Sequence, residues 1–152
     1  MADPISFTTA SPRFALPFLF AGQAQKEFYV NQAHALVDTL LHPVVEGTTE
    51  TPPAAPQEGQ AWLVGPAPTG AWQGQAGALA AFEAGTWLFV PPREGMQVFD
   101  QSTAQYARFS GGWQRATAPV APVGGTVVDS QARAAIVQLI EALASAGILP
   151  DA

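Results

Sequence analysis

The chain contains no cysteine, which excludes disulfide frameworks, thiolate metal sites and cysteine nucleophiles. Charge is also scarce, because charged residues make up only 12% of the 152 residues, about half the share usual in soluble proteins. So few charges favour a chain whose outer surface is largely covered by other subunits. An alanine-rich composition without any assembly role is the alternative explanation.

Clustered positive charge is missing too. Six lysines and arginines stand against twelve acidic residues, and the basic residues are scattered singly from Arg13 to Arg133. Because phosphate neutralisation needs clustered cations, we expect no nucleic-acid partner. The apolar stretch FALPFLF (14–20) is too short and too interrupted by proline to span a membrane or to form a signal-peptide core. We therefore expect synthesis in the cytoplasm without a signal peptide, and no membrane insertion.

An apolar arm lies near the N-terminus. Apolar residues fall on the even positions from 14 to 20, and Pro12 and Pro17 prevent a helix there. Its phenylalanines must be buried either on the chain's own core or on a neighbouring chain. We predict Phe14, Phe18 and Phe20 as assembly contacts.

A first helix is predicted from Gly22 to the residue before Pro43, which ends it. Apolar residues recur with the spacing of a half-buried helix at Tyr29, Ala33, Leu36, Val37, Leu40 and Leu41. His34 and His42 lie eight positions apart, which is not the spacing of a helical metal site. We expect no bound metal. Residues 1–45 are thus predicted to be an arm plus helix that anchors the chain.

Short strands follow a Pro- and Thr-rich linker that is predicted over residues 46–60. Six segments bounded by Gly, Pro or Ser turns read as strands: 61–65, 78–82, 86–90, 96–100, 105–109 and 112–116. The predicted fold is therefore α+β and mostly β, a small antiparallel β-meander or barrel-like domain over residues 61–118 between two helices. The segments AAFEAGTW and ARFSGGW resemble each other, which is a weak signal of hairpin duplication.

Residues 119–152 are predicted to be a second linker followed by an oligomerisation helix. Asp129 or Ser130 can cap this helix, and Gly147 is suited to end it. A single apolar helix behind a Pro-rich linker is marginally stable by itself, so we expect it to bundle with copies of itself through Ile136, Leu139 and Leu143. Packing on the β-domain is the alternative.

Catalytic patterns are absent from the predicted β-domain. Between residues 51 and 118 the acidic residues are Glu58, Glu83, Glu94 and Asp100, all in predicted turns or strand ends, and there is no histidine. No phosphate-binding loop precedes a helix, and no serine lies in a nucleophile elbow. We therefore expect no enzymatic activity and no cofactor.

Aromatic residues are the other notable feature of this domain. They suit stacking on sugar rings, and we predict Trp72, Tyr106 and Trp113 as glycan contacts. Filling the core is the competing role for these aromatics, and we assign it to Trp62 and Trp87, which lie inside predicted strands.

Residues 12–100 resemble a known family. The pieces that carry the resemblance are LPF with AGQAQKE, then the EGQAWLVG run and TGAWQG. They are similar to the domain-of-unknown-function family numbered 2793, found in bacteriophages, prophages and phage-like gene transfer agents of alphaproteobacteria. The closing helix is similar to C-terminal segments of phage fibre-type proteins.

The resemblance implies a structural component of a phage-like particle, a head spike, a fibre or a tail-associated part that contributes to attachment to the host surface. The low charge, the apolar arm and the tethered helix favour association with copies of the chain itself, with a trimer favoured and a pentamer possible. A capsid vertex or fibre protein is the further expected partner. Host surface polysaccharide is a further possible partner. A lectin-like domain that binds capsular polysaccharide directly is the alternative function, and a polysaccharide-degrading enzyme is the third.

Overall fold

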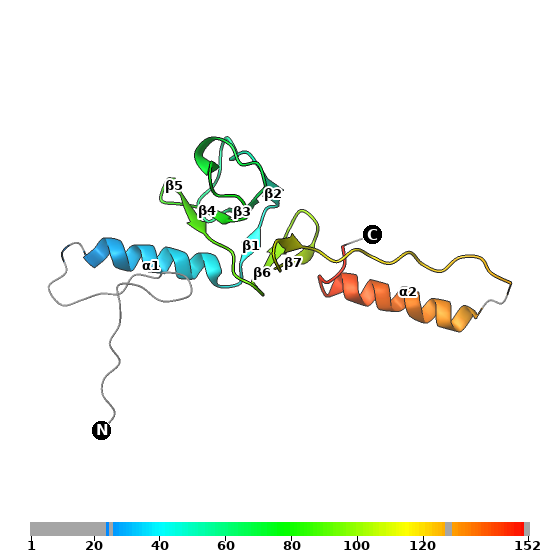
Figure 1. Ribbon diagram of the computed structural model, residues 1–152. Helices are drawn as coiled ribbons and strands as arrows, with labels where there is room; N and C mark the ends of the chain where they lie inside the picture. Colours follow the sequence, from blue (N-terminus) through cyan, green and yellow to red (C-terminus); the bar gives the residue numbers. More distant parts are fainter. Residues whose placement is uncertain (1–23, 25, 127–128, 151–152) are drawn as a thin grey trace, which may run out of the picture.

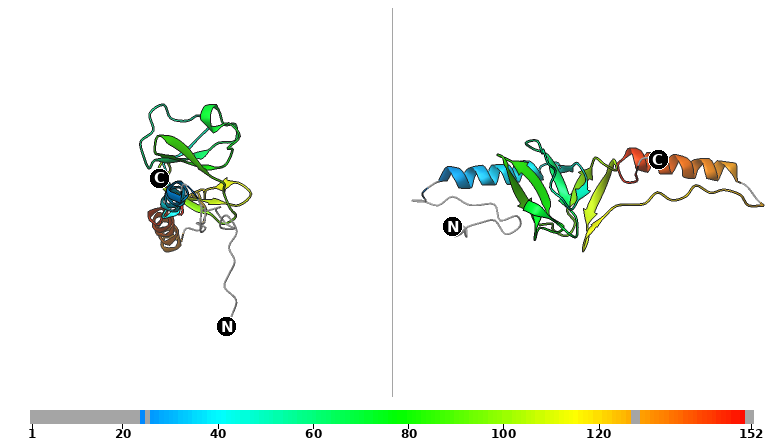
Figure 2. Two further views of the ribbon diagram at one scale, coloured as in Figure 1. Left: turned by 90° about the vertical axis from the view of Figure 1, so that its left-hand side faces the viewer. Right: turned by 90° about the horizontal axis from the view of Figure 1, so that it is seen from above.

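The protein is described by a computed structural model that covers residue 24, residues 26–126 and residues 129–150. Its parts follow one another along a line, with helix α1 at one end, eight strands in the middle and helix α2 at the other end (Figures 1 and 2). The predicted α+β, mostly β fold with a helix on each side is confirmed. No helix in the described part of the chain is both long and apolar enough to cross a membrane.

Helix α1 (Lys26–Leu40) touches the strands only through its C-terminal half. Leu36 is its one buried residue, and Leu40 packs against the same core from the side. The helix ends where His42 adopts a positive φ of 52° and Pro43 follows. The predicted apolar stripe is therefore only partly covered, since Tyr29 and Leu41 remain exposed.

The strands form two four-stranded sheets. Sheet one contains β2 (Thr48–Thr49), β3 (Ala61–Val64), β4 (Leu79–Glu83) and β5 (Thr86–Val90) in that order. Sheet two contains β1 (Val44–Val45), β6 (Gln97–Asp100), β7 (Gln105–Phe109) and β8 (Trp113–Gln114). The six predicted strands are all present, with ends that differ by at most two residues. The very short strands β1 and β2 were not predicted, and β2 lies within the segment interpreted as a linker.

The two sheets have the same topology. Each begins with a two-residue strand parallel to its neighbour, followed by two antiparallel pairings. Residues 44–49 supply both short strands, because this single extended segment pairs first with β6 and then with β3. The hydrogen bonds correspond as well: Phe99 N donates to Pro43 O and Leu63 N donates to Gly47 O, each at 2.9 Å. The β-module, residues 44–114, is thus an internal duplication.

A PxEG motif occurs once in each half of the duplication, at the same place before a strand. PQEG (56–59) precedes β3 and PREG (92–95) precedes β6. The Glu58 carboxylate accepts hydrogen bonds from Ala84 N and Gly85 N at 2.7 and 2.8 Å, and the Glu94 carboxylate accepts one from Gly111 N at 2.6 Å. Each glutamate therefore holds the hairpin turn of its own sheet.

The aromatic pairs of the two hairpins also correspond. Phe82 meets Trp87 and Phe109 meets Trp113, both edge to face, with ring centroids 5.1 and 5.4 Å apart. The predicted hairpin similarity was thus the visible part of a longer repeat.

The two sheets stack in the same sense, which means that the inner face of sheet one corresponds to the outer face of sheet two. Leu63 pairs with Leu79 in sheet one, as Phe99 pairs with Tyr106 in sheet two. The leucines point into the main core between the sheets, whereas the corresponding aromatics lie on the far side of sheet two. The buried residues of this core are Leu36, Val45, Ala61, Leu63, Leu79, Ala81, Val90, Val98 and Ala107. Stacking in this sense places these aromatics on the face of sheet two that no sheet covers.

The outer face of sheet one is closed by its own loop. Residues 65–78 fold back over it, and a short 3-10 helix (η1, Gly70–Trp72) places the Trp72 ring against the rings of Trp62 and Trp87, which also contact each other. Trp72 is 0% exposed, while Trp62 and Trp87 are partly exposed. Trp72, which was predicted as a glycan contact, is therefore a core residue. The loop supplies its own apolar anchor, a role that its Gly- and Pro-rich sequence conceals.

Helix α2 (Ser130–Ser145) is reached by an extended stem, residues 117–126, that leads away from the strands before the helix returns (Figure 1). The Asp129 carboxylate caps it by accepting from Gln131 N and Ala132 N, as predicted. Gly147, at a φ of 70°, follows its end and accepts a hydrogen bond from Tyr106 N at 2.7 Å. Leu149 is buried. The helix is docked on sheet two only at its C-terminal end.

A candidate assembly surface

The uncovered side of sheet two is called the open face here. It carries alternate residues of β1, β6, β7 and β8: Val44, Gln97, Phe99, Tyr106, Arg108 and Gln114. Tyr106 is 49% exposed and Val44 is 43% exposed. The Tyr106 ring packs edge to face on Phe99, with centroids 5.3 Å apart. An apolar centre is thus surrounded by polar side chains.

Three hollows meet at Tyr106. One of about 500 Å³ extends toward His42 and Pro43, and one of about 450 Å³ extends past Arg108 to Ile148. The third, about 360 Å³, lies between Tyr106 and the last turn of α2. The open face therefore continues without a break onto the helix.

Gly147 makes this close approach of helix and sheet possible. A Cβ atom at this position would lie 3.4 Å from ring atoms of both Phe99 and Tyr106, and the positive φ adds backbone strain for any other residue. The C-terminal tail therefore covers one part of the open face and leaves the rest accessible.

The predicted assembly residues of α2 lie together on one side of the helix. Ile136 is 42% exposed and Leu139 is 60% exposed, while Leu143 is partly buried. No residue within α2 is buried. The predicted assembly residues Phe14, Phe18 and Phe20 lie outside the described residues.

Helix α1 carries exposed apolar side chains at the opposite end of the molecule, on more than one side of the helix. Phe28 and Leu41 are 65% and 64% exposed, and Tyr29 and Val37 are also exposed. Tyr29, Val37 and Leu41 belong to the stripe that was predicted to be half buried, but the β-module covers only the last turns of the helix. Uncovered apolar side chains thus occur on both sides of a well-packed centre.

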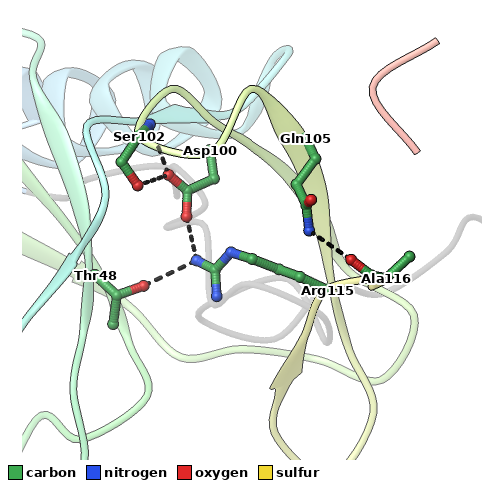
Figure 3. A network of polar contacts seen from close by, with 6 residues as sticks. All are labelled: Thr48, Asp100, Ser102, Gln105, Arg115 and Ala116. Atoms are coloured by element: carbon green, nitrogen blue, oxygen red, sulfur yellow. Dashed lines mark hydrogen bonds and ion pairs between the residues drawn. The ribbon is translucent and has the colours of Figure 1, made fainter. Parts of the chain in front are cut away.

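A buried ion pair braces the β-module behind the open face (Figure 3). Asp100 is 1% exposed, accepts from Ser102 N at 3.0 Å and Ser102 Oγ at 2.6 Å, and pairs with the Arg115 guanidinium. Arg115 also donates to Thr48 Oγ1 at 2.9 Å, and Gln105 Nε2 donates to Ala116 O at 3.2 Å. The network joins β2, sheet two and Ala116, the residue before the stem, so its role is to stabilise the β-module.

The other notable acidic group lies between α1 and sheet one. Partial burial, followed by the negative charges of Asp38 and Glu58, raises the pKa of Glu83 above its ordinary value. In the part of the chain that the structure describes, no three histidine and acidic side chains lie close enough to hold a metal ion.

The three predicted glycan contacts are not brought together. Trp72 is buried and cannot present its ring to a sugar, so that prediction is wrong. The Trp113 indole donates to Gly77 O at 2.8 Å and packs against the main core, on the opposite side of sheet two from Tyr106. Tyr106 alone has its ring half exposed.

Residues 30–114 match the family model described as a protein of unknown function, DUF2793. The chain belongs to this family. The matched residues run from the first turns of α1 to the end of β8, so the DUF2793 region contains both sheets of the duplication and excludes the stem and α2. No curated protein matches the chain. The open face is therefore part of the family region, while the helix that adjoins it is not.

Proposed function

We propose that this DUF2793 protein is a structural subunit of a phage-like particle, a gene transfer agent or prophage. In this role it forms a homo-oligomeric spike or fibre, or the base of one, that contributes to attachment to the host cell surface. The carrying observation is that apolar side chains are left uncovered on both helices although the β-module has a complete core.

Helix stability supports self-assembly. An isolated helix of 16 residues is marginal in water, and α2 buries none of its residues. Bundling with copies of itself would cover Ile136 and Leu139 and supply the missing stabilisation. A bundle of three parallel helices is the favoured arrangement, with five as the alternative.

The particle assignment is supported by the resemblance of residues 12–100 to a family found in phages and gene transfer agents. It agrees with the low charge content of 12%, which suits a subunit enclosed by neighbours. In this arrangement α1 and the arm before it would contact a capsid vertex or fibre protein.

Light scattering during size-exclusion chromatography tests the self-assembly. We expect the wild-type chain to elute as an oligomer at micromolar concentration, and Leu139→Glu to elute as a monomer because a charge would enter the bundle core. Gln138→Glu is the matched control, since it adds the same charge at an exposed polar position. A stable wild-type monomer would refute the proposal.

The particle assignment needs a separate experiment in the producing bacterium. A tagged chain is expected to sediment with purified particles through a density gradient, and particles from a deletion strain are expected to adsorb more slowly to host cells. Particles that lack the chain in the wild-type strain would contradict the assignment.

A further inference from the structure

The open face differs in chemistry from the corresponding face of sheet one. In sheet one the two central cross-strand pairs are apolar, Ala61 with Ala81 and Leu63 with Leu79. In sheet two they are Gln97 with Arg108 and Phe99 with Tyr106. Another sheet stacked there would bury the ends of these polar side chains without partners, at a considerable free-energy cost. The exchange therefore favours a ligand that brings polar groups of its own.

The open face is also small for a protein partner. Its exposed large apolar side chains are those of Tyr106 and Val44, 49% and 43% exposed. Stable protein interfaces bury about 800 Å² on each partner and involve roughly 20 to 30 residues a side. The two larger hollows that meet at Tyr106, about 500 and 450 Å³, have the size of small-molecule sites instead. A small ligand, or one segment of an extended polymer, fits this surface.

The charge around Tyr106 is opposite in sign to that of the whole chain, which has a net charge of −6. Among the described residues, no Asp or Glu lines any of the three hollows, whereas Arg108 and Arg115 both line the one of about 450 Å³. Arg115 is held by the buried Asp100 (Figure 3), but Arg108 is exposed and forms no ion pair with any described residue. A carboxylate complements Arg108, because a guanidinium can bind it through two parallel hydrogen bonds.

The remaining side chains suit a sugar. The Tyr106 ring is supported edge to face by Phe99 and is half exposed, as a ring that stacks on the apolar side of a sugar must be. Gln97 lines both larger hollows, and Gln114 lines the one beside Arg108. Their amide groups donate and accept hydrogen bonds, which matches the double character of sugar hydroxyls. Because the hollows continue away from Tyr106 in different directions, neighbouring sugars of a polymer also find room.

We propose that the open face binds an acidic polysaccharide of the host surface, with one sugar ring stacked on Tyr106 and the carboxylate of a uronic acid held by Arg108. The site deepens the attachment role proposed above, on which it rests, by naming the chemistry of the ligand. It needs one chain only and is therefore independent of self-assembly.

Calorimetric titration of the full chain tests the site. The probes are oligosaccharides prepared from three polymers that contain uronic acids: alginate, pectate and hyaluronate. We expect wild type to bind at least one of them, and Tyr106→Ala and Arg108→Gln each to weaken that binding at least tenfold. Absence of binding to all three, or binding by Tyr106→Ala as tight as that of wild type, would overturn the proposal.

Matched variants separate the site from general effects of losing a ring or a charge. Tyr29→Ala removes an exposed tyrosine of α1, and Arg93→Gln removes an exposed arginine in the turn before β6. Both should bind as wild type does, and Tyr106→Phe should keep most of the affinity because it keeps the ring. Circular dichroism shows that each variant is folded. Equal losses in Arg93→Gln and Arg108→Gln would refute a specific role of Arg108.

Two further polymers test the class of ligand. Dextran is a neutral polysaccharide and polyglutamate is an acidic polypeptide, so each shares one property with the proposed ligand. We expect both to bind at least tenfold more weakly than the best uronic-acid oligosaccharide. Dextran binding of equal strength would refute the acidic ligand. Polyglutamate binding of equal strength, unchanged in Tyr106→Ala, would assign the open face to an acidic peptide.

The site and the proposed function fail in different ways. If particles without the chain adsorb normally although the purified chain binds a uronic-acid oligosaccharide through Tyr106, the attachment role is refuted and the site stands. If adsorption depends on the chain but no oligosaccharide binds, only the site is refuted. Tyr106→Ala should elute from size-exclusion chromatography as wild type does, and a change in its oligomeric state would assign the open face to self-assembly instead.

Discussion

Sheet one and sheet two are built on the same plan, yet one is closed on both faces and the other is not. The connection after β3 is a long loop that inserts Trp72 over its sheet, whereas the connection after β6 is the short turn 101–104. Where sheet one has the buried Val64, sheet two has the buried Asp100. The two halves of the duplication therefore differ in how they are stabilised. Sheet one has an apolar anchor, Trp72, over its outer face, whereas sheet two has a buried ion pair and an exposed aromatic face.

The largest expected effect is on the anchor of sheet one. Trp72→Ala should lower the free energy of unfolding by about 3 to 5 kcal/mol, because it empties a fully buried site against two other tryptophans. Urea denaturation followed by circular dichroism measures this. Tyr106→Ala on sheet two is the comparison and should cost less than about 1 kcal/mol in the monomer, because that ring is half exposed. Equal costs would refute the contrast between the sheets.

Trp72→Phe refines the same test. The Trp72 indole nitrogen is buried and has no hydrogen-bond partner among the described residues. We therefore expect phenylalanine, which removes that polar group and keeps an aromatic ring, to cost clearly less than alanine. A loss as large as that of Trp72→Ala would contradict a purely apolar role for the ring.

A smaller loss of stability is expected when Asp100 of sheet two is replaced by valine, the residue at the corresponding position 64 of sheet one. Asp100→Val should cost about 3 kcal/mol, since it leaves the partly buried Arg115 without its acidic partner. Adding Arg115→Leu should restore most of this loss, because buried ion pairs are often replaceable by apolar residues. Urea denaturation of the two single variants and the double variant gives the coupling free energy between positions 100 and 115. Additive losses in the double variant would show that the pair does not act as a unit.

The two PxEG glutamates should differ modestly. Glu58→Ala and Glu94→Ala should each lower stability by about 1 kcal/mol, with the larger loss at Glu58 because its carboxylate accepts two backbone hydrogen bonds rather than one. Glu141→Ala, at an exposed position of α2 outside both motifs, serves as the control for charge removal. A larger loss at Glu94 would contradict this account of the turns.

The smallest effect concerns pH and the side of sheet one that faces α1. Since the pKa of Glu83 is raised in the folded state, folding favours its protonated form, and this contribution is lost as pH rises through the raised pKa. Between pH 7 and pH 5, wild type should therefore gain slightly more stability than Glu83→Gln, as measured by urea midpoints at both pH values. An identical pH dependence in the two chains would exclude this site as its source.

The strands were predictable because Gly and Pro turns separate them and their residues favour extended backbone. The sequence did not reveal that residues 44–49 pair with β6 and with β3. Strands β1 and β2 have two residues each, too few for any periodicity, and they form because hydrogen-bonding edges of both sheets lie beside residues 44–49. The PxEG repeat was visible in the sequence and could have indicated the duplication.

The surface residues were harder to predict than the strands. Trp72 was predicted as a glycan contact because it lies in a loop, yet its burial is decided by contacts with tryptophans that are distant in the sequence. Tyr106, Ile136 and Leu139 are exposed as their proposed roles require. The open face itself could not be predicted, because which side of a strand is covered depends on the sense in which the sheets stack.

The segment 44–49 also determines how the β-module loses its structure. In most repeat proteins each unit touches only its neighbours, so an array can unravel from one end. Here one stretch of chain belongs to both hydrogen-bond ladders, so neither sheet can release it without weakening the other. The two halves should therefore unfold as one cooperative unit, and a mechanical load applied through α1 would enter at Pro43 and be shared by both sheets.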